Sequence, residues 1–316
     1  MASPGTPRVP DVITDRTTGR RISLLDTKAA NARASWLLFL AMIVLLGGVG
    51  YLLALAFDAS GAIWFVGIAV AVAVIQSFVA WRYGDRMVLA STGARRATRE
   101  EHRYLVNVSE AVSIGAGVPM PRTFVIDDPA PNAFATGRDP EHASIAVTTG
   151  LLDLLGREEL EGVIAHEMAH VRNYDIRFMS LLAATVGALM ILRDLVWRWM
   201  FFGRRRSGGG GKGQALVGVA LLVVLIVAPI LATLLRFAVS RRREYLADAT
   251  GAYITRNPEG LARALEKLRD YSGTPLKVSN GVRHLFIANP AARASAVGLL
   301  STHPPISERI DRLRRM

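Results

Sequence analysis

The chain has 316 residues, a formal net charge of +12, no cysteine, and hydrophobic side chains at 51% of its positions. Without cysteine, disulfides and thiolate zinc sites are excluded, so any metal must be held by His, Asp or Glu. The hydrophobic share is high for a soluble globular protein and indicates membrane segments. Basic residues cluster beside the apolar runs without any RNA- or DNA-binding signature, so we expect a lipid bilayer as partner and no nucleic acid.

Residues 1–33 are polar, basic and rich in Pro and Thr, and we expect a flexible N-terminal tail. A membrane hairpin is predicted at 34–81, where two charge-free runs, 34–57 and 59–81, follow each other. Each run is long enough to cross a hydrocarbon core of about 30 Å. Arginines flank the hairpin, so the positive-inside rule places both of its ends in the cytoplasm. A buried hairpin of a soluble protein is the alternative.

The first part of a catalytic domain is predicted at 82–176. Its expected elements are a helix at about 96–114, a strand at 123–126, a loop at 127–132, a strand at 144–148 and a helix at about 157–173. β-Branched residues favour the strands, and glutamates in the first turns of the last helix suit its dipole. Strand 144–148 is a candidate for an edge strand that receives an extended substrate, with an ordinary sheet strand as the alternative.

A second membrane hairpin is predicted at 177–236, with a basic, glycine-rich loop at 203–213. If both of its apolar runs span the membrane, this loop faces outward, against the positive-inside rule. A helical pair that is only partly buried in the membrane is the alternative. The second part of the catalytic domain follows at 237–316. It is expected to hold a helix that starts at Pro258 with Asn257 as N-cap, and a short amphipathic helix at 306–314.

The segment from His166 to His170 has the pattern H-E-x-x-H. On a helix the two histidines stand one turn apart, so both imidazoles project from one face and can bind one Zn²⁺. Glu167 stands beside the first histidine and can take a proton from a metal-bound water as that water attacks a peptide carbonyl. The chain has only six histidines, so a chance match is rare. An ordinary pair of helix histidines is the alternative.

A catalytic zinc ion needs a third protein ligand and one open position. Glu244, just beyond the last apolar run, is the best candidate for this ligand. Asp248 follows one helical turn later on the same face, where it can accept the outer N–H of a ligating histidine and hold its tautomer. The alternative is an exposed helix on which Glu244 pairs with a neighbouring arginine. The expected cofactor is therefore one Zn²⁺ per chain, bound by His166, His170 and Glu244.

H-E-x-x-H followed far downstream by E-x-x-x-D resembles the glutamate-zincin metalloproteases. The chain resembles more closely the HtpX-type membrane metalloproteases, which are relatives of the CAAX prenyl endopeptidases. The matching segments are 132–137, 149–152, 166–170 with Asn173 and Asp175, 240–248, and 302–305 with Glu308 and Arg309. Their order and spacing cover about residues 35–316. The basic, glycine-rich loop departs from the family pattern, and the N-terminal tail lies outside the resemblance.

Together with the apolar runs, the resemblance predicts a mainly α integral membrane protein. It would have about four transmembrane helices and a small α+β zincin-like catalytic domain on the cytoplasmic side of a bacterial inner membrane. The resemblance implies a zinc-dependent endopeptidase that cleaves membrane or misfolded proteins in membrane protein quality control. It also brings His303 and Arg309 near the metal, where we expect one or both to hydrogen-bond the developing oxyanion.

Two other functions stay open at this point. A prenyl-protein endopeptidase would need a large enclosed chamber built from more membrane helices than the four expected here. A non-catalytic membrane scaffold would have no use for an intact base, three metal ligands and Asp248. The sequence does not specify the natural substrates, the regulation or the oligomeric state.

Overall fold

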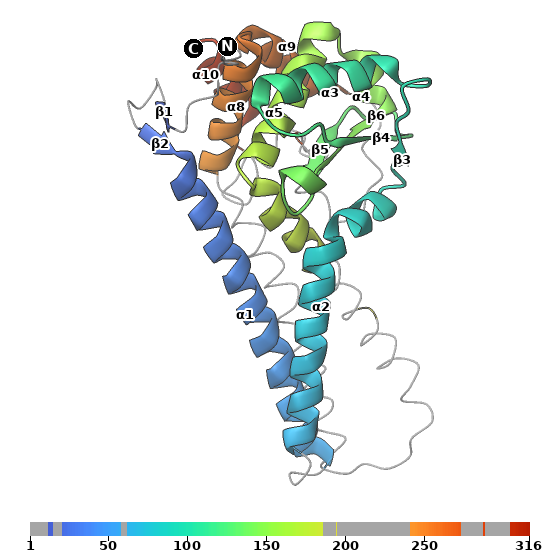
Figure 1. Cartoon of the computed structure of the whole chain (residues 1–316), viewed down its shortest axis with the longest axis vertical. Helices are drawn as coiled ribbons and strands as arrows, with labels where there is room; N and C mark the ends of the chain where they lie inside the picture. The colour runs from blue at the N-terminus through green and yellow to red at the C-terminus, as the bar shows by residue number, and fades with distance from the viewer. Residues whose placement is uncertain are drawn as a thin grey trace, which may run out of the picture.

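The computed structural model describes residues 12–14, 21–57, 62–185, 194, 241–272, 287 and 304–316. Within these residues the protein is mainly helical, with one small mixed sheet and a long helical hairpin that carries the other helices at one end (Figure 1). Two expectations fall wholly or largely outside the described residues: the second membrane hairpin at 177–236 with its loop at 203–213, and His303. About half of the tail expected at 1–33 is described, namely residues 12–14 and 21–33.

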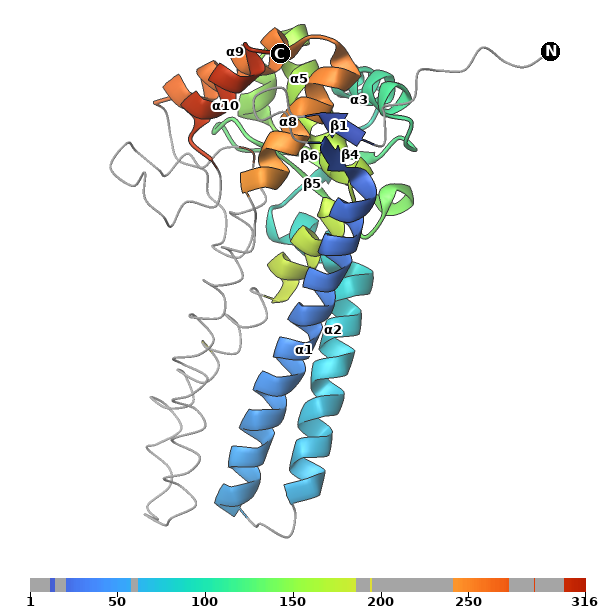
Figure 2. The same cartoon turned by 90° about the vertical axis from the view of Figure 1, so that its left-hand side faces the viewer.

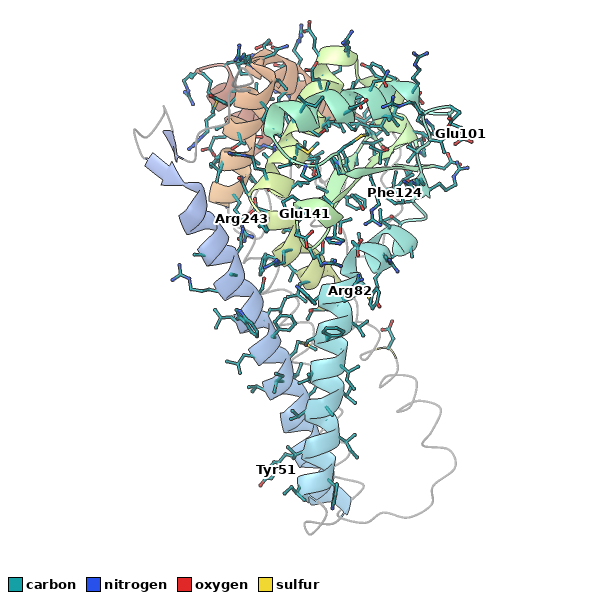
Figure 3. The ribbon with its side chains drawn as sticks, viewed as in Figure 1. Tyr51, Arg82, Glu101, Phe124, Glu141 and Arg243 are labelled. Carbon is teal, nitrogen blue, oxygen red and sulfur yellow. The ribbon has the colours of Figure 1, made fainter. Side chains whose placement is uncertain are left out.

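The hairpin consists of α1 (Leu24–Phe57) and α2 (Ala62–Ser91), which pack along each other. Each contains a stretch apolar and long enough to cross a bilayer, Ala29–Gly48 and Val66–Ser91. Large apolar side chains point outward from both helices; Trp36 and Trp64, for example, are 72% and 74% exposed. Such exposure fits contact with lipid rather than water. Figure 3 shows Tyr51 toward the far end of the hairpin and Arg82 close to the other helices.

Two candidate membrane spans are thus present among the described residues, where the sequence predicts about four in the whole chain. α1 begins ten residues before its charge-free run and α2 ends ten residues after its own, because helical hydrogen bonding continues into the polar residues at the end of the hairpin near the sheet. Two short strands, β1 (Val12–Thr14) and β2 (Arg21–Ser23), pair antiparallel just before α1, in the segment expected to be a flexible tail.

The sheet has four strands in the order β3-β4-β6-β5. They are β3 (Arg95–Arg96), β4 (Arg122–Ile126), β5 (Ala133–Thr136) and β6 (Ser144–Thr148). β4 and β6 run parallel, whereas the two outer strands pair antiparallel with them. The two strands predicted from β-branched residues are confirmed as β4 and β6. β5 was expected neither as a strand nor as an edge, because its alanines have low strand propensity.

Of the two readings left open for 144–148, the ordinary sheet strand is confirmed, and the edge strand that receives substrate is wrong. β6 pairs with β4 on one side and with β5 on the other, so both of its edges already make backbone hydrogen bonds. β5 is the outer strand at that end of the sheet, and it packs against the helix that carries H-E-x-x-H. Sheet order depends on which segments pair in space, which the β-branched pattern of a single strand does not encode.

Three helices accompany the sheet: α3 (Arg103–Ala116), α4 (Thr149–Leu154) and α5 (Arg157–Arg172). α3 begins later than the expected residue 96, because residues 95–96 pair with β4 instead. It ends at Gly117, whose φ of 67° is a left-handed helix cap that favours glycine. α5 begins as predicted, and its Glu159 side chain accepts a hydrogen bond from the Gly156 N–H.

The C-terminal helices are α8 (Arg241–Thr255), α9 (Pro258–Asp270) and α10 (Ile306–Leu313). The predicted start of α9 is confirmed, since the Asn257 side chain accepts a hydrogen bond from the Gly260 N–H. In both views these helices gather around α5 at the same end of the hairpin as the sheet (Figures 1 and 2). α5 thus becomes the centre of the core, and most of its residues are buried.

Two glycines let neighbouring helices approach α5 closely. A Cβ on Gly162 of α5 would lie 2.7 Å from the backbone nitrogen of Leu261 on α9. A Cβ on Gly251 of α8 would lie 3.0 Å from the backbone nitrogen of His166. Because backbone atoms cannot move aside as a side chain does, the packing at Gly162 requires glycine, and a Cβ at Gly251 would push the two backbones apart by a few tenths of an ångström.

Substitution of Gly162 by alanine should therefore lower the free energy of unfolding by about 1–3 kcal/mol, as overpacking does. The measurement is thermal or chemical unfolding of the purified full-length protein. Gly67→Ala in α2 is the matched control, because a Cβ there meets nothing within 4 Å and alanine is the better helix former. Equal stability of the Gly162→Ala variant and the wild type would contradict the close approach of α9 to α5.

Candidate metal centre

The two histidines of H-E-x-x-H lie on the face of α5 that is turned toward α8. Their ring centroids are 4.8 Å apart, and the rings are perpendicular. The His166 side chain is 1% exposed and that of His170 is 16% exposed. Both imidazoles are therefore held by packing before any ligand binds, as a site on a rigid element requires.

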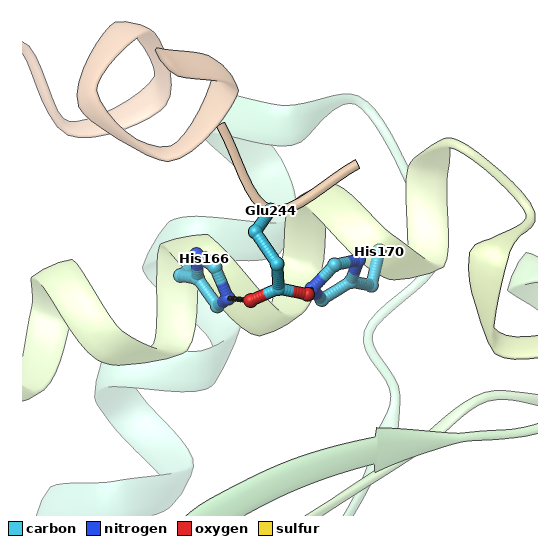
Figure 4. A group of neighbouring side chains, drawn as sticks. All are labelled: His166, His170 and Glu244. Atoms are coloured by element: carbon cyan, nitrogen blue, oxygen red, sulfur yellow. Dashed lines mark ion pairs between the residues drawn. The ribbon is translucent and has the colours of Figure 1, made fainter. Parts of the chain in front are cut away.

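Glu244 reaches between the two imidazoles from the first turn of α8 (Figure 4). Its two carboxylate oxygens lie 3.8 Å from His166 Nε2 and 3.6 Å from His170 Nε2. Ligand atoms at about 2.1 Å from a tetrahedral metal are about 3.4 Å from one another. The three side chains thus have the separation that a single small metal ion demands, and their ligand atoms all lie within 4.8 Å.

A carboxylate holds the outer nitrogen of each histidine. His166 Nδ1 lies 2.9 Å from Asp248 Oδ1, and His170 Nδ1 lies 2.9 Å from Asp175 Oδ2. These contacts keep the proton of each neutral imidazole on Nδ1 and leave both Nε2 atoms facing Glu244. From the sequence, such a contact was expected of Asp248 only.

Asp175 stood in the segments that carry the family resemblance, but no role was assigned to it. It follows the end of α5, where Tyr174 adopts a φ of 61° and turns the chain back toward His170. This left-handed residue follows Asn173, at which the helix ends. The available signal was the polar sequence Asn173-Tyr174-Asp175, shortly after His170. A short turn at this point brings a carboxylate back toward the end of the helix that carries the histidines.

Arg309 is completely buried, and its guanidinium lies on the Nδ1 side of His166. Its Nε and Nη2 donate to the two carboxylate oxygens of Asp248 at 2.8 and 2.7 Å. Its Nη1 donates to the carbonyl oxygen of Ile287 at 3.3 Å. Arg309 is thus placed to support Asp248. The expectation that one or both of His303 and Arg309 hydrogen-bond the oxyanion stays a prediction. His303, the expected partner of Arg309, lies outside the described residues.

The charge of Arg309 changes the electrostatics of its partner. Burial alone would raise the pKa of Asp248, but the charge and hydrogen bonds of Arg309 outweigh burial and hold the pKa at about 2. Asp248 is therefore ionised at neutral pH and acts as an acceptor toward His166 Nδ1. An Arg–carboxylate pair with two parallel hydrogen bonds also restrains the orientation of the carboxylate.

The surroundings of His170 favour positive charge at this imidazole. Burial lowers its pKa, but the hydrogen bond to Asp175 and the charge of Glu244 outweigh that effect and raise the pKa to about 9. The carboxylates of Asp175 and Glu244 would likewise attract a metal cation at Nε2 of His170. The site is thus built for positive charge, as the chemistry of its three ligand atoms also indicates.

Glu167 is 2% exposed and lies beside the ligand atoms. Burial raises the pKa of its carboxyl, and the charge of Glu244 adds to the rise. The two histidines and the backbone N–H of Ala135, on β5, act in the opposite direction. A raised pKa brings a carboxylate nearer to the range in which it can accept and then deliver a proton at neutral pH.

A narrow cleft opens beside these groups. It is lined by the metal-ligand candidates and Glu167 together with the apolar residues Ala135, Ile176, Met179 and Ile287. The backbone N–H of Ile287 donates to the carbonyl oxygen of Ala133 at 3.1 Å, at the start of β5. Sequence reasoning did not single out Ile287, since nothing local marks a residue that joins a strand from a distant segment.

The sequence model of Peptidase family M48 matches residues 99–316. The chain belongs to peptidase family M48. One relative, a "Protease HtpX homolog" of Dictyoglomus turgidum, is 45% identical over 288 residues, which are 91% of this chain and 93% of the relative. A protein of the same name from Thermoanaerobacter pseudethanolicus is 42% identical over 94% of this chain and 99% of that relative. The resemblance to HtpX-type proteases is thereby confirmed, and this M48 peptidase is a metalloendopeptidase.

Among solved structures, Ste24p of S. mikatae aligns with this M48 chain at a TM-score of 0.46 and 18% sequence identity. The alignment covers 92% of this chain and 66% of Ste24p, so the chain spans just under two thirds of that protein's length.

Removal of the Arg309 charge should destabilise the M48 fold. In Arg309→Met the carboxylate of Asp248 stays buried without its charged partner, and breaking such a pair costs about 3–5 kcal/mol. The free energy of unfolding is the quantity to measure. Arg315→Met is the control, because Arg315 lies two residues beyond the end of α10 and is exposed; it should change stability by less than about 0.5 kcal/mol. If both variants unfold like the wild type, the Arg309–Asp248 pair does not exist as described.

Proposed function

We propose that this M48 peptidase is a membrane-bound zinc endopeptidase in which His166, His170 and Glu244 hold one Zn²⁺ and Glu167 is the general base. The observation that carries the proposal is the distance of 3.6 to 3.8 Å from the Glu244 oxygens to the two Nε2 atoms. Two imidazoles and one carboxylate are a donor set that zinc accepts in catalytic sites, with the fourth position left for water or substrate.

Bound zinc would polarise the substrate carbonyl and make water a stronger nucleophile at neutral pH. The protein's own groups then have distinct tasks. Glu167 takes the proton of the attacking water on its carboxylate and returns it to the leaving nitrogen. Asp248 and Asp175 keep both imidazoles in the tautomer that binds metal through Nε2, and Arg309 holds Asp248 in place.

We also propose that an extended substrate segment lies along β5. This strand is the outer strand of the sheet next to α5, and the backbone N–H of Ala135 reaches Glu167. Backbone pairing with an edge strand gives affinity without sequence preference. The apolar wall formed by Ile176, Met179 and Ile287 then favours an apolar side chain of the substrate in the cleft.

The membrane assignment rests on α1 and α2, which are long and apolar enough to span a bilayer. We propose a bacterial inner-membrane protein with about four spans, the second pair lying in 177–236. Arg82 and Arg86 stand at the end of the hairpin that carries the catalytic helices, which by the positive-inside rule is the cytoplasmic end. The proposed substrates are membrane or misfolded proteins, and the proposed role is membrane protein quality control.

His303 remains the proposed hydrogen-bond donor to the oxyanion of the tetrahedral intermediate. It precedes Pro304 and Pro305, directly before α10, which also carries Arg309. Because Arg309 is engaged with Asp248, we assign that arginine a positioning role and leave the direct contact to His303.

Glu167→Gln is expected to bind zinc normally and to lose proteolysis by a factor of about 10² to 10⁴, because the amide cannot accept the proton. Zinc content by mass spectrometry and turnover of casein are the measurements. Glu161→Gln, on the same helix but away from the ligand atoms, serves as the control and should retain both properties. A Glu167→Gln variant that cleaves at the wild-type rate would remove this residue from the mechanism.

Glu244→Ala should lose zinc together with activity, because two histidines alone leave the ion without its anionic ligand. Asp248→Asn should keep the ion but weaken its binding about 10- to 100-fold, as changes to the groups behind metal ligands do. Zinc occupancy is measured after dialysis against buffered low free zinc. Full occupancy of Glu244→Ala under these conditions would point to a different third ligand.

A further inference from the structure

One polar side chain of the membrane hairpin is buried against the metal centre. Asn31 of α1 is 5% exposed, and it lies in the stretch Ala29–Gly48 that is apolar enough to span a membrane. A buried amide must find partners for its donor and its acceptor, because an unsatisfied polar group costs free energy. Nothing in the proposed mechanism uses this residue.

The partners of Asn31 come from the two elements that carry metal ligands. Its Nδ2 donates to Asp175 Oδ1 at 2.6 Å. Its Oδ1 accepts a hydrogen bond of 3.1 Å from Nη1 of Arg243, which Figure 3 shows beside the upper part of α1. Asp175 follows α5, and Arg243 lies on the first turn of α8. The amide thus bridges the two elements at their shared end.

Asp175 contacts one metal-ligand candidate, and Arg243 precedes another in the chain. Oδ2 of Asp175, the oxygen that Asn31 does not bind, lies 2.9 Å from His170 Nδ1. Arg243 directly precedes Glu244, and its guanidinium lies 4.7 Å from the ring centroid of Phe178. Because Asn31 binds the first oxygen of Asp175, it sets the rotation that turns the second oxygen toward His170. Its contact with Arg243 restrains the turn of α8 from which Glu244 projects.

We infer that Asn31 is a positioning residue that makes the membrane helix α1 part of the support of the metal centre. The inference rests on the proposed zinc site and adds to it a route from the bilayer to the ligands. A movement of α1 along or about its axis changes the contacts of Asp175 and Arg243 together. The geometry of the metal site is thereby coupled to the seating of α1 in the membrane.

The chemistry of an amide is what this position requires. An asparagine can donate on one side and accept on the other, whereas an aspartate can only accept when it is ionised. Asn31→Asp is nearly isosteric and keeps the acceptor for Arg243, but it places a second carboxylate against Asp175. A merely space-filling role for Asn31 would make Asn31→Asp the mildest substitution, whereas the positioning role makes it at least as harmful as Asn31→Ala.

The test uses the full-length protein in lipid nanodiscs, with zinc affinity measured by competition against a chromogenic chelator. Asn31→Ala and Asn31→Asp should each weaken zinc binding by about tenfold, the lower end of the effect of outer-shell changes on metal sites. Ser35→Ala is the matched control. Ser35 lies one turn further along α1 and is 6% exposed, and its hydroxyl donates only to the backbone oxygen of Asn31 in the contacts described.

Cobalt substitution supplies a second readout, because the visible spectrum of the bound ion reports its ligand geometry. The inference predicts an altered cobalt spectrum in both Asn31 variants and a wild-type spectrum in Ser35→Ala. Wild-type zinc affinity and cobalt spectrum in both Asn31 variants would overturn it. An equal loss of zinc affinity in Ser35→Ala would also overturn it, because any disturbance of α1 would then weaken zinc binding. If the wild type itself binds no zinc, the proposed function fails first.

Discussion

The gathering of four buried carboxylates around two histidines is the constraint on which the rest of this structure depends. Glu167, Asp175, Glu244 and Asp248 are each no more than 2% exposed. Burial of so many negative charges is strongly unfavourable unless positive charges stand among them. Arg309 and Arg243 supply two of these, and a divalent cation between the two imidazoles would supply the remainder. The negative charge of the four carboxylates is therefore balanced jointly by the two arginines and by the cation that the metal-ligand candidates would hold.

This balance explains why the helices around α5 pack as closely as they do. Glu244, Asp248 and Gly251 lie on one face of α8, at intervals of four and three residues. The two carboxylates reach the histidines only because Gly251 lets the backbone of α8 approach that of α5. Gly162 does the same for α9. Close backbone contact excludes water, and exclusion of water strengthens the ion pairs that form there.

The membrane hairpin also takes part in this arrangement. α1 delivers Asn31 to the acidic cluster, and α2 continues into the segment that leads to the sheet. The catalytic helices are thus held by the membrane helices through specific hydrogen bonds as well as through chain connectivity. For a protease whose proposed substrates lie in or on the membrane, such contacts would fix the distance of β5 and the cleft from the two candidate membrane spans.

The sequence alone determined the features that local periodicity controls. The spacing of His166 and His170 places both rings on one face of a helix, and the length of the charge-free runs predicts the membrane helices, because each follows from residues a few positions apart. Cap residues such as Asn257 marked a helix start for the same reason. The need for a third metal ligand, together with the one-turn spacing of Glu244 and Asp248, then pointed to these two residues far along the chain.

Only the tertiary structure decided how these pieces meet. It placed β6 inside the sheet and β5 at its edge, set Asp175 against His170, turned Arg309 toward Asp248, and brought Asn31 to the site from the membrane. Such contacts join residues separated by up to 212 positions in the chain, as Arg243 and Asn31 are. They depend on packing of whole elements and on the charge balance of a buried cluster, which no short stretch of sequence contains.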